Sequence, residues 1–192
     1  MAVVEQADVR EIWFAGPAAT PWLKSLYEES VARDIPWRSV SSRTLEKAIG
    51  GIRLEVLHPE PGFGDPNEND HSLVLRAAVG GKRILFTGDI EAGAERELLE
   101  MKAVVTADIL KVAHHGSQTS STPDFLRSVR PSEAVVEAGF RNRLHHPAEA
   151  VLRRLKDSGI RVWRGDLCGE ITFKISGTEV SLSTGRLCAG SV

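Results

Sequence analysis

The sequence contains few cysteines and no long apolar segment. Its two cysteines, Cys168 and Cys188, are too few for a disulfide-built scaffold, and neither has the CxxC spacing or the neighbouring histidine of a zinc site. They lie twenty positions apart, which allows either a disulfide between neighbouring strands or two separate thiols. No run of eighteen apolar residues occurs, so no part of these 192 residues is predicted to span a membrane, and the N-terminus lacks the charged and apolar regions of a signal peptide.

A strong excess of charge of either sign is also absent. The formal net charge is -2, with 42% hydrophobic and 26% charged residues. This composition predicts one compact domain over residues 1–192, with a loose tail at residues 185–192. The near-zero net charge excludes a histone-like nucleic-acid binder but leaves room for a local basic patch.

Short apolar segments of strand length alternate with segments of helix length, which predicts an α/β fold. The expected strands are residues 9–14, 37–40, 52–57, 71–79, 82–87, 107–113, 134–138, 160–163, 170–175 and 179–182, and the expected helices are residues 21–32, 91–101, 123–129 and 147–158. Thr20 and Thr122 each precede a proline and are expected to cap helices. Gly80 and Gly81 form the expected turn of an antiparallel hairpin. Residues 41–51 are predicted to be mainly a polar link.

Metal-binding side chains follow two of the apolar segments. Asp89 comes just after residues 82–87, and His114 and His115 follow residues 107–113. Strand ends can place such groups side by side, and a carboxylate with imidazoles suits zinc, manganese or iron. Two consecutive histidines point to different sides, so only one of them is expected to be a direct ligand. The alternative roles are a helix N-cap for Asp89 and a hydrogen-bonded turn for the histidines.

The loop before the hairpin supplies a second set of metal-ligand candidates. Residues 58–70 hold three prolines and four acids without a basic residue, which predicts a loop. Asp70 and His71 stand where the chain enters the first strand of the hairpin. Because this strand starts where the second one ends, Asp70 and Asp89 are expected at the same edge. Asp70 is therefore a candidate near the metal, and His71 is either a further ligand or incidental.

Hydroxyl groups form a first candidate site for phosphate. Ser117, Thr119 and Ser120 lie in a loop ahead of the predicted helix 123–129. The free amides at a helix N-terminus bind phosphate oxygens well, so these side chains are expected to contact substrate. The alternative is that they only cap the helix.

A basic segment forms a second candidate site for phosphate. Residues 141–164 contain seven Lys or Arg and two acids, a local charge of +5. Arg141, Arg143 and His146 fall in a predicted loop and are expected to contact the backbone of a polyanion. The arginines within the predicted helix 147–158 fit a solvated helix face equally well.

These motifs occur in a specific order. Asn69-Asp70-His71-Ser72 is followed by the Gly80-Gly81 turn, Thr87-Gly88-Asp89, Val112-Ala113-His114-His115-Gly116-Ser117 and Asn142-Arg143-Leu144-His145-His146-Pro147. This order resembles the metallo-β-lactamase-fold domain at the C-terminal end of the ComEC family of DNA-uptake channel proteins. The resemblance implies a four-layer αββα fold with two sheets, of which this chain would hold one half complete and the other partial. His145 stands where the family commonly has glycine.

One signature of that fold is absent. Its enzymes carry His-x-His-x-Asp-His, which supplies about half of the metal ligands, and no such string occurs in these 192 residues. The chain is therefore expected to be the C-terminal piece of a longer protein, starting after the signature, and to bind metal poorly by itself. Exposed sheet edges are expected to favour a homodimer.

The resemblance implies metal-assisted hydrolysis of phosphodiesters in DNA during natural transformation. Asp89 would bridge two divalent ions, zinc or manganese, His115 would be a ligand, and His114 would stabilise the transition state or protonate the leaving oxygen; the two histidines are open to exchange. The implied partners are DNA and the rest of a transmembrane channel protein, and the implied location is the outer face of the bacterial cytoplasmic membrane. This chain alone is expected to show no appreciable hydrolysis. The alternative function is a non-catalytic DNA-binding or docking module.

Overall fold

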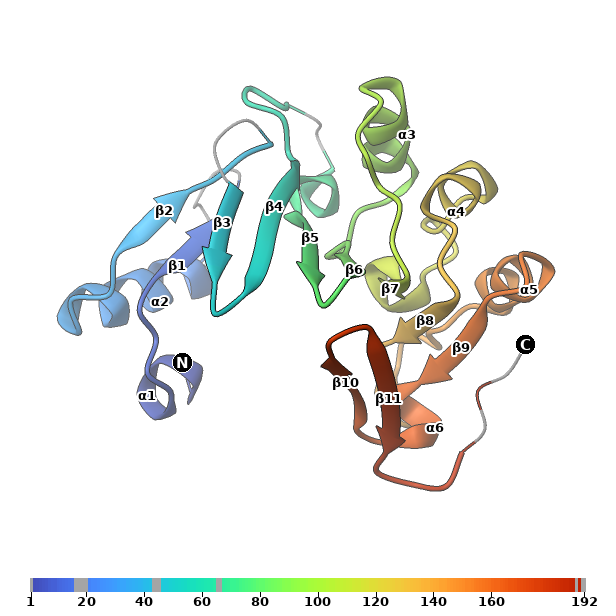
Figure 1. Cartoon of the computed structure of the whole chain (residues 1–192). Coiled ribbons are helices and arrows are strands. Elements are labelled where there is room, and N and C mark those ends of the chain that lie inside the picture. The colour runs from blue at the N-terminus through green and yellow to red at the C-terminus, as the bar shows by residue number, and fades with distance from the viewer. Residues whose placement is uncertain (1, 16–20, 43–45, 65–66, 189, 191–192) are drawn as a thin grey trace.

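The largest element of the structure is a seven-stranded mixed sheet (Figure 1). The computed structural model describes residues 2–15, 21–42, 46–64, 67–188 and 190. The strands lie in the order β3 (Glu46–Ile49), β4 (Ile52–His58), β5 (Val74–Val79), β6 (Lys82–Phe86), β7 (Ile109–Lys111), β8 (Glu133–Val136) and β9 (Arg161–Arg164). Strands β3 to β6 pair antiparallel, and β6 to β9 pair parallel.

Three helices connect the parallel strands and lie together along the sheet in Figure 1: α3 (Ala92–Glu100), α4 (Pro123–Val129) and α5 (Glu149–Asp157). Strands and helices share one buried core, to which the sheet contributes Leu85, Leu110 and Ala134 and the helices contribute Leu98, Phe125 and Leu155. Each fully buried leucine or phenylalanine stabilises the fold by about 1.5–3 kcal/mol. The core therefore holds the carboxyl ends of β6, β7 and β8 at a common edge of the sheet, where the loops with the predicted site residues begin.

The remaining elements flank the large sheet. They are α1 (Ala2–Gln6), β1 (Ile12–Phe14), α2 (Pro21–Ala32), β2 (Trp37–Ser39), α6 (Gly165–Cys168), β10 (Ile171–Ser176), β11 (Glu179–Thr184) and two 3-10 turns, Glu68–His71 and Ala113–Gly116. β1 pairs with β2 in parallel, and β10 pairs with β11 antiparallel. The turn of the β10–β11 hairpin meets that of β5–β6, since a Cβ on Gly80 would overlap the carbonyl oxygen of Gly177.

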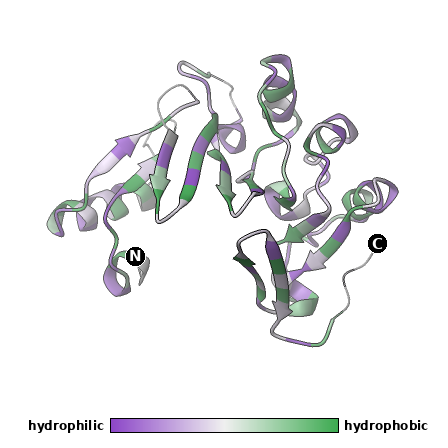
Figure 2. Cartoon of the chain, viewed as in Figure 1, coloured by the Kyte–Doolittle hydropathy of each residue, from purple (hydrophilic) through white to green (hydrophobic). Residues whose placement is uncertain are grey.

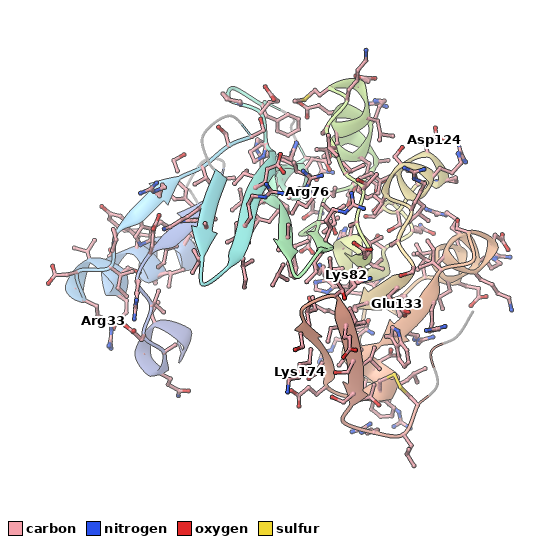
Figure 3. The ribbon with its side chains drawn as sticks, viewed as in Figure 1. Arg33, Arg76, Lys82, Asp124, Glu133 and Lys174 are labelled. Atoms are coloured by element: carbon pink, nitrogen blue, oxygen red, sulfur yellow. A yellow bond between two sulfur atoms is a disulfide. The ribbon has the colours of Figure 1, made fainter. Side chains whose placement is uncertain are left out.

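A disulfide joins Cys168 of α6 to Cys188 (Figure 3). Of the two alternatives that the sequence leaves open, the bridge is the one present. The closed loop contains β10 and β11, and the backbone amide of Arg186 donates a hydrogen bond to the carbonyl of Cys168 (2.9 Å). The bond attaches part of the segment predicted as a loose tail to the body of the protein.

The three helices that connect the parallel strands are amphipathic. Figure 2 shows both apolar and polar residues on α3, α4 and α5. In α5, Val151 and Leu155 are buried, whereas Arg153 and Lys156 are exposed. Within the described ranges, no helix combines the length and the apolar character needed to cross a membrane.

The predicted α/β class is confirmed, and α4 has the predicted bounds. Some predictions of local structure are wrong. Strand β3 occupies part of the predicted polar link, and α1 and α6 were not predicted. The strand predicted at 71–79 begins only at Val74, because Glu68–His71 form a 3-10 turn that Asn67 caps with its side chain. The predicted cap Thr20 lies outside the described residues.

Candidate active site

Asp89 and His115 converge at the carboxyl ends of β6 and β7. The Nε2 atom of His115 lies 3.7 Å from Oδ1 of Asp89, and both side chains are partly open to solvent. The other ring nitrogen of His115, Nδ1, lies 2.6 Å from the carbonyl oxygen of Glu137. A carbonyl only accepts hydrogen bonds, so Nδ1 carries the proton and Nε2 presents a lone pair. Histidines that bind metals are usually oriented in this way, by a hydrogen bond from the nitrogen that does not bind.

Lys111 is a third charged group at this point, which the sequence analysis did not single out. Its ammonium lies 3.8 Å from Oδ1 of Asp89 and donates a hydrogen bond to the carbonyl of Gly88 (3.0 Å). The side chain is mostly buried beside the carboxylate. The ammonium therefore offsets part of the negative charge of the carboxylate.

The Thr87-Gly88-Asp89 motif depends on close contact with Ser72. Gly88 has φ +55°, and a Cβ at this position would lie 2.6 Å from the Cβ of Ser72. The hydroxyl oxygen of Ser72 accepts a hydrogen bond from the backbone amide of Asp89 (3.1 Å). Glycine is therefore required both for the turn and for the contact. The entrance of β5 thus fixes the backbone that carries Asp89.

The two histidines have an uncommon backbone conformation. His114 and His115 have φ values of +47° and +54°, and Gly116 follows with φ +83°. A left-handed conformation costs about 1–2 kcal/mol for a residue with a Cβ, and such strain is frequent at functional sites. A Cβ on Gly116 would lie 2.6 Å from that of Pro147, so the histidine turn packs against the His146-Pro147 loop.

Glu91 contacts His114. The sequence analysis did not identify Glu91 as a site residue. Nδ1 of His114 lies 3.1 Å from Oε1 of Glu91. The carboxylate of Glu91 also accepts hydrogen bonds from the amide groups of Asn67 (3.1 Å) and Asn69 (3.2 Å). Burial raises the pKa of Glu91, but hydrogen bonds from Asn69, Thr119 and Asn67 together lower it below its ordinary value. The carboxylate therefore stays charged beside the imidazole.

Asp70 contacts the backbone of Glu91, two residues after Asp89. Its carboxylate is buried and accepts a hydrogen bond from the backbone amide of Glu91 (2.6 Å). His71 packs its ring edge-on against Phe63, with the ring centroids 5.2 Å apart. The structure thus gives Asp70 a supporting contact to the site, and the metal role of Asp70 and His71 remains a prediction.

His146 joins the site from the loop after β8. Its ring centroid lies 5.7 Å from that of His114. Burial is the main cause that lowers the pKa of His146, and the neighbouring His114 and His115 lower it further. Asn142 fixes the backbone of His146, because its side chain accepts from the amide of His146 (2.9 Å) and donates to the carbonyl (2.7 Å). The predicted residues Arg141 and Arg143 are exposed in the same loop.

The three predicted hydroxyl groups differ in exposure. Ser120 is buried and donates to the carbonyl of Ile90 (2.9 Å), so its role is structural. Ser117 is also buried, and its hydroxyl lies 2.9 Å from that of Thr119. Thr119 alone of the three is exposed to solvent, so only this hydroxyl is open to a ligand in the observed conformation.

The described side chains supply part of a metal site. In the part of the chain that the structure describes, no three or more His, Cys, Asp or Glu side chains are arranged to hold a metal ion. Asp89 and His115 fit two positions of a coordination shell by their chemistry and by the orientation of the imidazole. Any further ligands would have to come from outside this set.

Fold and site together define a mixed α/β domain with a carboxylate–imidazole centre at the carboxyl ends of its parallel strands. No family model matches the chain. It is 39% identical over 127 residues to ComE operon protein 3 of Bacillus subtilis, covering 66% of this chain and 16% of that protein. It is 37% identical over 124 residues to Competence protein ComA of Neisseria gonorrhoeae, covering 64% and 18%. Over more than half of its length the chain is thus similar to competence proteins of the ComEC family, and the predicted resemblance is confirmed.

The similarity extends to further proteins. Recombination protein 2 of Haemophilus influenzae is 33% identical over 105 residues, covering 55% of this chain and 13% of that protein. The chain thus spans less than a fifth of the length of these relatives. Among solved structures, a putative Zn-dependent hydrolase of the metallo-β-lactamase superfamily from Thermotoga maritima matches with a TM-score of 0.37 and 11% identity, over 77% of this chain and 67% of that one.

Proposed function

We propose that the chain is part of a metal-dependent phosphodiester hydrolase that cuts DNA during natural transformation. The observation that carries this proposal is the pairing of Asp89 with the lone pair of His115 Nε2, at a distance of 3.7 Å. The similarity to Competence protein ComA of Neisseria gonorrhoeae supports the biological setting. Because the chain covers so little of the length of its relatives, the substrate and the location are proposed and rest on analogy.

In this proposal Asp89 and His115 hold a divalent metal, zinc or manganese, together with ligands from outside the described residues. When bound, the metal supplies Lewis-acid stabilisation of the phosphoryl group that is attacked. Lys111 lies 3.8 Å from Oδ1 of Asp89 and steadies the turn by its hydrogen bond to the carbonyl of Gly88. As the family resemblance implies, Asp89 would also serve a second ion of the same kind.

His114 acts on the substrate side of the site. Glu91 lies beside Nδ1 of its imidazole, so Nε2 is the ring nitrogen that remains for the phosphate. His114 stabilises the developing negative charge or donates a proton to the leaving oxygen. Arg141, Arg143 and His146 contact neighbouring phosphates.

The domain works as part of a larger assembly in this proposal. Its partners are DNA and the rest of a transmembrane channel protein, and it lies on the outer face of the bacterial cytoplasmic membrane. Homodimers form through exposed sheet edges. Strand β3, which pairs only with β4 among the described strands, is one such edge.

The proposal is tested with the domain extended upstream as its gene encodes it. Asp89→Ala and His115→Ala should each lower manganese- or zinc-dependent cleavage of DNA by about 100-fold or more, with less metal bound. Asp124→Ala, which removes an exposed carboxylate on α4, and His145→Ala, which removes an exposed imidazole, are matched controls and should keep full activity. Unchanged cleavage by both site variants would exclude the metal assignment.

A non-catalytic DNA-binding or docking module is the second candidate function. It is favoured by the presence of only two suitably placed ligands among the described side chains. The two functions differ in their dependence on metal. If the extended domain binds DNA equally well with and without manganese or zinc and never cleaves it, the docking function is correct.

A further inference from the structure

The loop between β8 and α5 exposes two large apolar side chains beside the candidate active site. Phe140 is 66% exposed and Leu144 is 69% exposed. Large apolar groups at this degree of exposure indicate a binding surface where they are grouped with side chains that recognise a ligand. Arg141 and Arg143 stand between them in sequence, and both are exposed as well. The functional assignments above do not use Phe140 or Leu144.

The loop is held in a defined conformation. The amide group of Asn142 donates to the carbonyls of Gly139 (3.0 Å) and His146 (2.7 Å), and its oxygen accepts from the amide of His146 (2.9 Å). Arg141 and His145 have φ values of +52° and +54°, in a region that disfavours side chains by about 1–2 kcal/mol. Phe140 and Leu144 are therefore exposed on a loop whose backbone is fixed by the hydrogen bonds of Asn142.

Phe140 already stacks with a cation. The guanidinium carbon of Arg141 lies 5.1 Å from the centroid of the Phe140 ring. This contact limits the orientations of both side chains, while most of the ring stays open to solvent. The pair therefore offers an aromatic face next to a group that binds phosphate.

The loop lies at the border of the catalytic centre. Its last residue, His146, places its ring 5.7 Å from that of His114. At its other end the loop begins next to Glu137, the residue after β8, whose carbonyl orients His115. A nucleic-acid strand with one phosphate at the centre would therefore place adjoining nucleotides near the loop.

We infer that Phe140 is a stacking platform for an unpaired nucleobase, with Arg141 and Arg143 on the adjacent phosphates, so that the site takes single-stranded nucleic acid. In a duplex both faces of each base are covered by its neighbours, whereas an unpaired base can lie on an aromatic ring. The two arginines provide the charge complementarity to the backbone. This inference rests on the proposed function for the reaction, but it concerns binding, which is measured without cleavage.

The test measures binding of the 192-residue chain in the presence of a chelator, so that no cleavage occurs. Fluorescence anisotropy gives the affinity for a labelled oligothymidine, for the same oligomer with abasic sites, and for a closed hairpin duplex. The natural chain should bind the oligothymidine roughly tenfold more tightly than the abasic oligomer. Phe140→Ala should remove that difference, and Phe140→Trp should retain it.

Two further variants separate stacking from charge. Arg143→Ala should weaken binding of both single-stranded oligomers alike and reduce the salt dependence of binding. Tyr27→Ala, which removes another exposed aromatic ring, on α2, should leave all affinities unchanged. Because Phe140 is mostly exposed, its variants should keep the circular dichroism spectrum of the natural chain.

The outcomes distinguish this inference from the proposed hydrolase. Equal affinity for the normal and abasic oligomers, or tighter binding of the duplex, overturns the stacking role while the hydrolase proposal stands. An unchanged affinity of Phe140→Ala likewise overturns it and leaves the loop to a protein partner. If the chain binds no oligomer even at low salt, both the stacking role and DNA as the substrate fail.

Discussion

The two consecutive histidines contact different partners because of their backbone conformation. His115 lies beside the carboxylate of Asp89 and the carbonyl of Glu137, and His114 lies beside Glu91. The expectation that two successive residues point to different sides came from the geometry of a strand. In the structure both residues lie after β7, in a left-handed turn. The divergence is the predicted one, but the turn that produces it, and with it the contact to Glu91, was not predictable from strand periodicity.

His58 gives the fold a pH dependence at the level of a single residue. The side chain is completely buried, and its Nε2 donates to the carbonyl of Asp70 (2.6 Å). Burial lowers the pKa of His58 below its ordinary value, and its hydrogen bond and the nearby acids offset this only in part. Below about pH 6.5 the unfolded chain therefore binds a proton at His58 that the folded chain does not bind. The free energy of unfolding decreases as the pH is lowered, by up to about 1.4 kcal/mol per pH unit.

His58→Gln tests this dependence, because glutamine keeps an N–H donor but does not titrate. The free energy of unfolding in urea, measured at about pH 7.5 and pH 5.5, should fall less in the variant than in the natural chain. His145→Gln removes an exposed histidine and should keep the full decrease. Equal decreases in the natural chain and in His58→Gln would contradict the assignment of the effect to His58.

At the level of elements, α3 and α5 hold residues 120–122, which follow the histidine turn. Glu95 of α3 is buried, and its carboxylate accepts hydrogen bonds from the amides of Ser121 (2.5 Å) and Thr122 (2.8 Å). Arg154 of α5 donates to the carbonyls of Ser120 (2.7 Å) and Ser121 (2.9 Å). From its sequence position, Arg154 could have served either solubility or the binding of a polyanion. These contacts show that it has a structural role. Residues 120–122 are thus held by hydrogen bonds from two helices that lie elsewhere in the sequence.

Glu95→Ala should lower the free energy of unfolding by about 2–4 kcal/mol, because it leaves two buried amides without their acceptor. Glu100→Ala on the same helix removes an exposed carboxylate whose ion pair with Arg96 is long (3.9 Å), and it should change stability by less than about 0.5 kcal/mol. Urea denaturation followed by circular dichroism measures both variants. A loss in Glu95→Ala as small as in Glu100→Ala would show that water replaces the carboxylate.

Sequence patterns predicted the elements better than the contacts between them. The hairpin at Gly80 and Gly81 was predicted from its glycine pair, and the same signal at Gly50 and Gly51, both with positive φ, joins β3 to β4 and was missed because it follows a polar stretch. The convergence of Asp89 with His115 followed from their places at strand ends. The role of Glu91 did not, because its sequence position also fits the first turn of a helix, and only the fold brings His114 to it.

At the level of the whole molecule, the disulfide holds the end of the chain against side chains of β9, the last strand of the large sheet. Strand β9 pairs only with β8 among the described strands. A Cβ on Gly190 would lie 2.7 Å from the side chain of Arg161 and 2.9 Å from that of Trp163, so the end of the chain runs against β9. Cys188, two residues earlier, is bonded to Cys168. The covalent bond therefore holds this segment in place.

Reduction of this disulfide should destabilise the chain by about 3 kcal/mol, since the bond closes a loop of roughly twenty residues in the unfolded state. It should also raise self-association, because the end of the chain is released from β9 and an open edge pairs with other strands. Urea denaturation and sedimentation velocity, each with and without a reductant, measure the two effects. The double variant Cys168→Ser with Cys188→Ser should behave like the reduced chain and should not respond to reductant. If reduction lowers stability without changing the sedimentation coefficient at any concentration, the dimer proposed through sheet edges does not use β9.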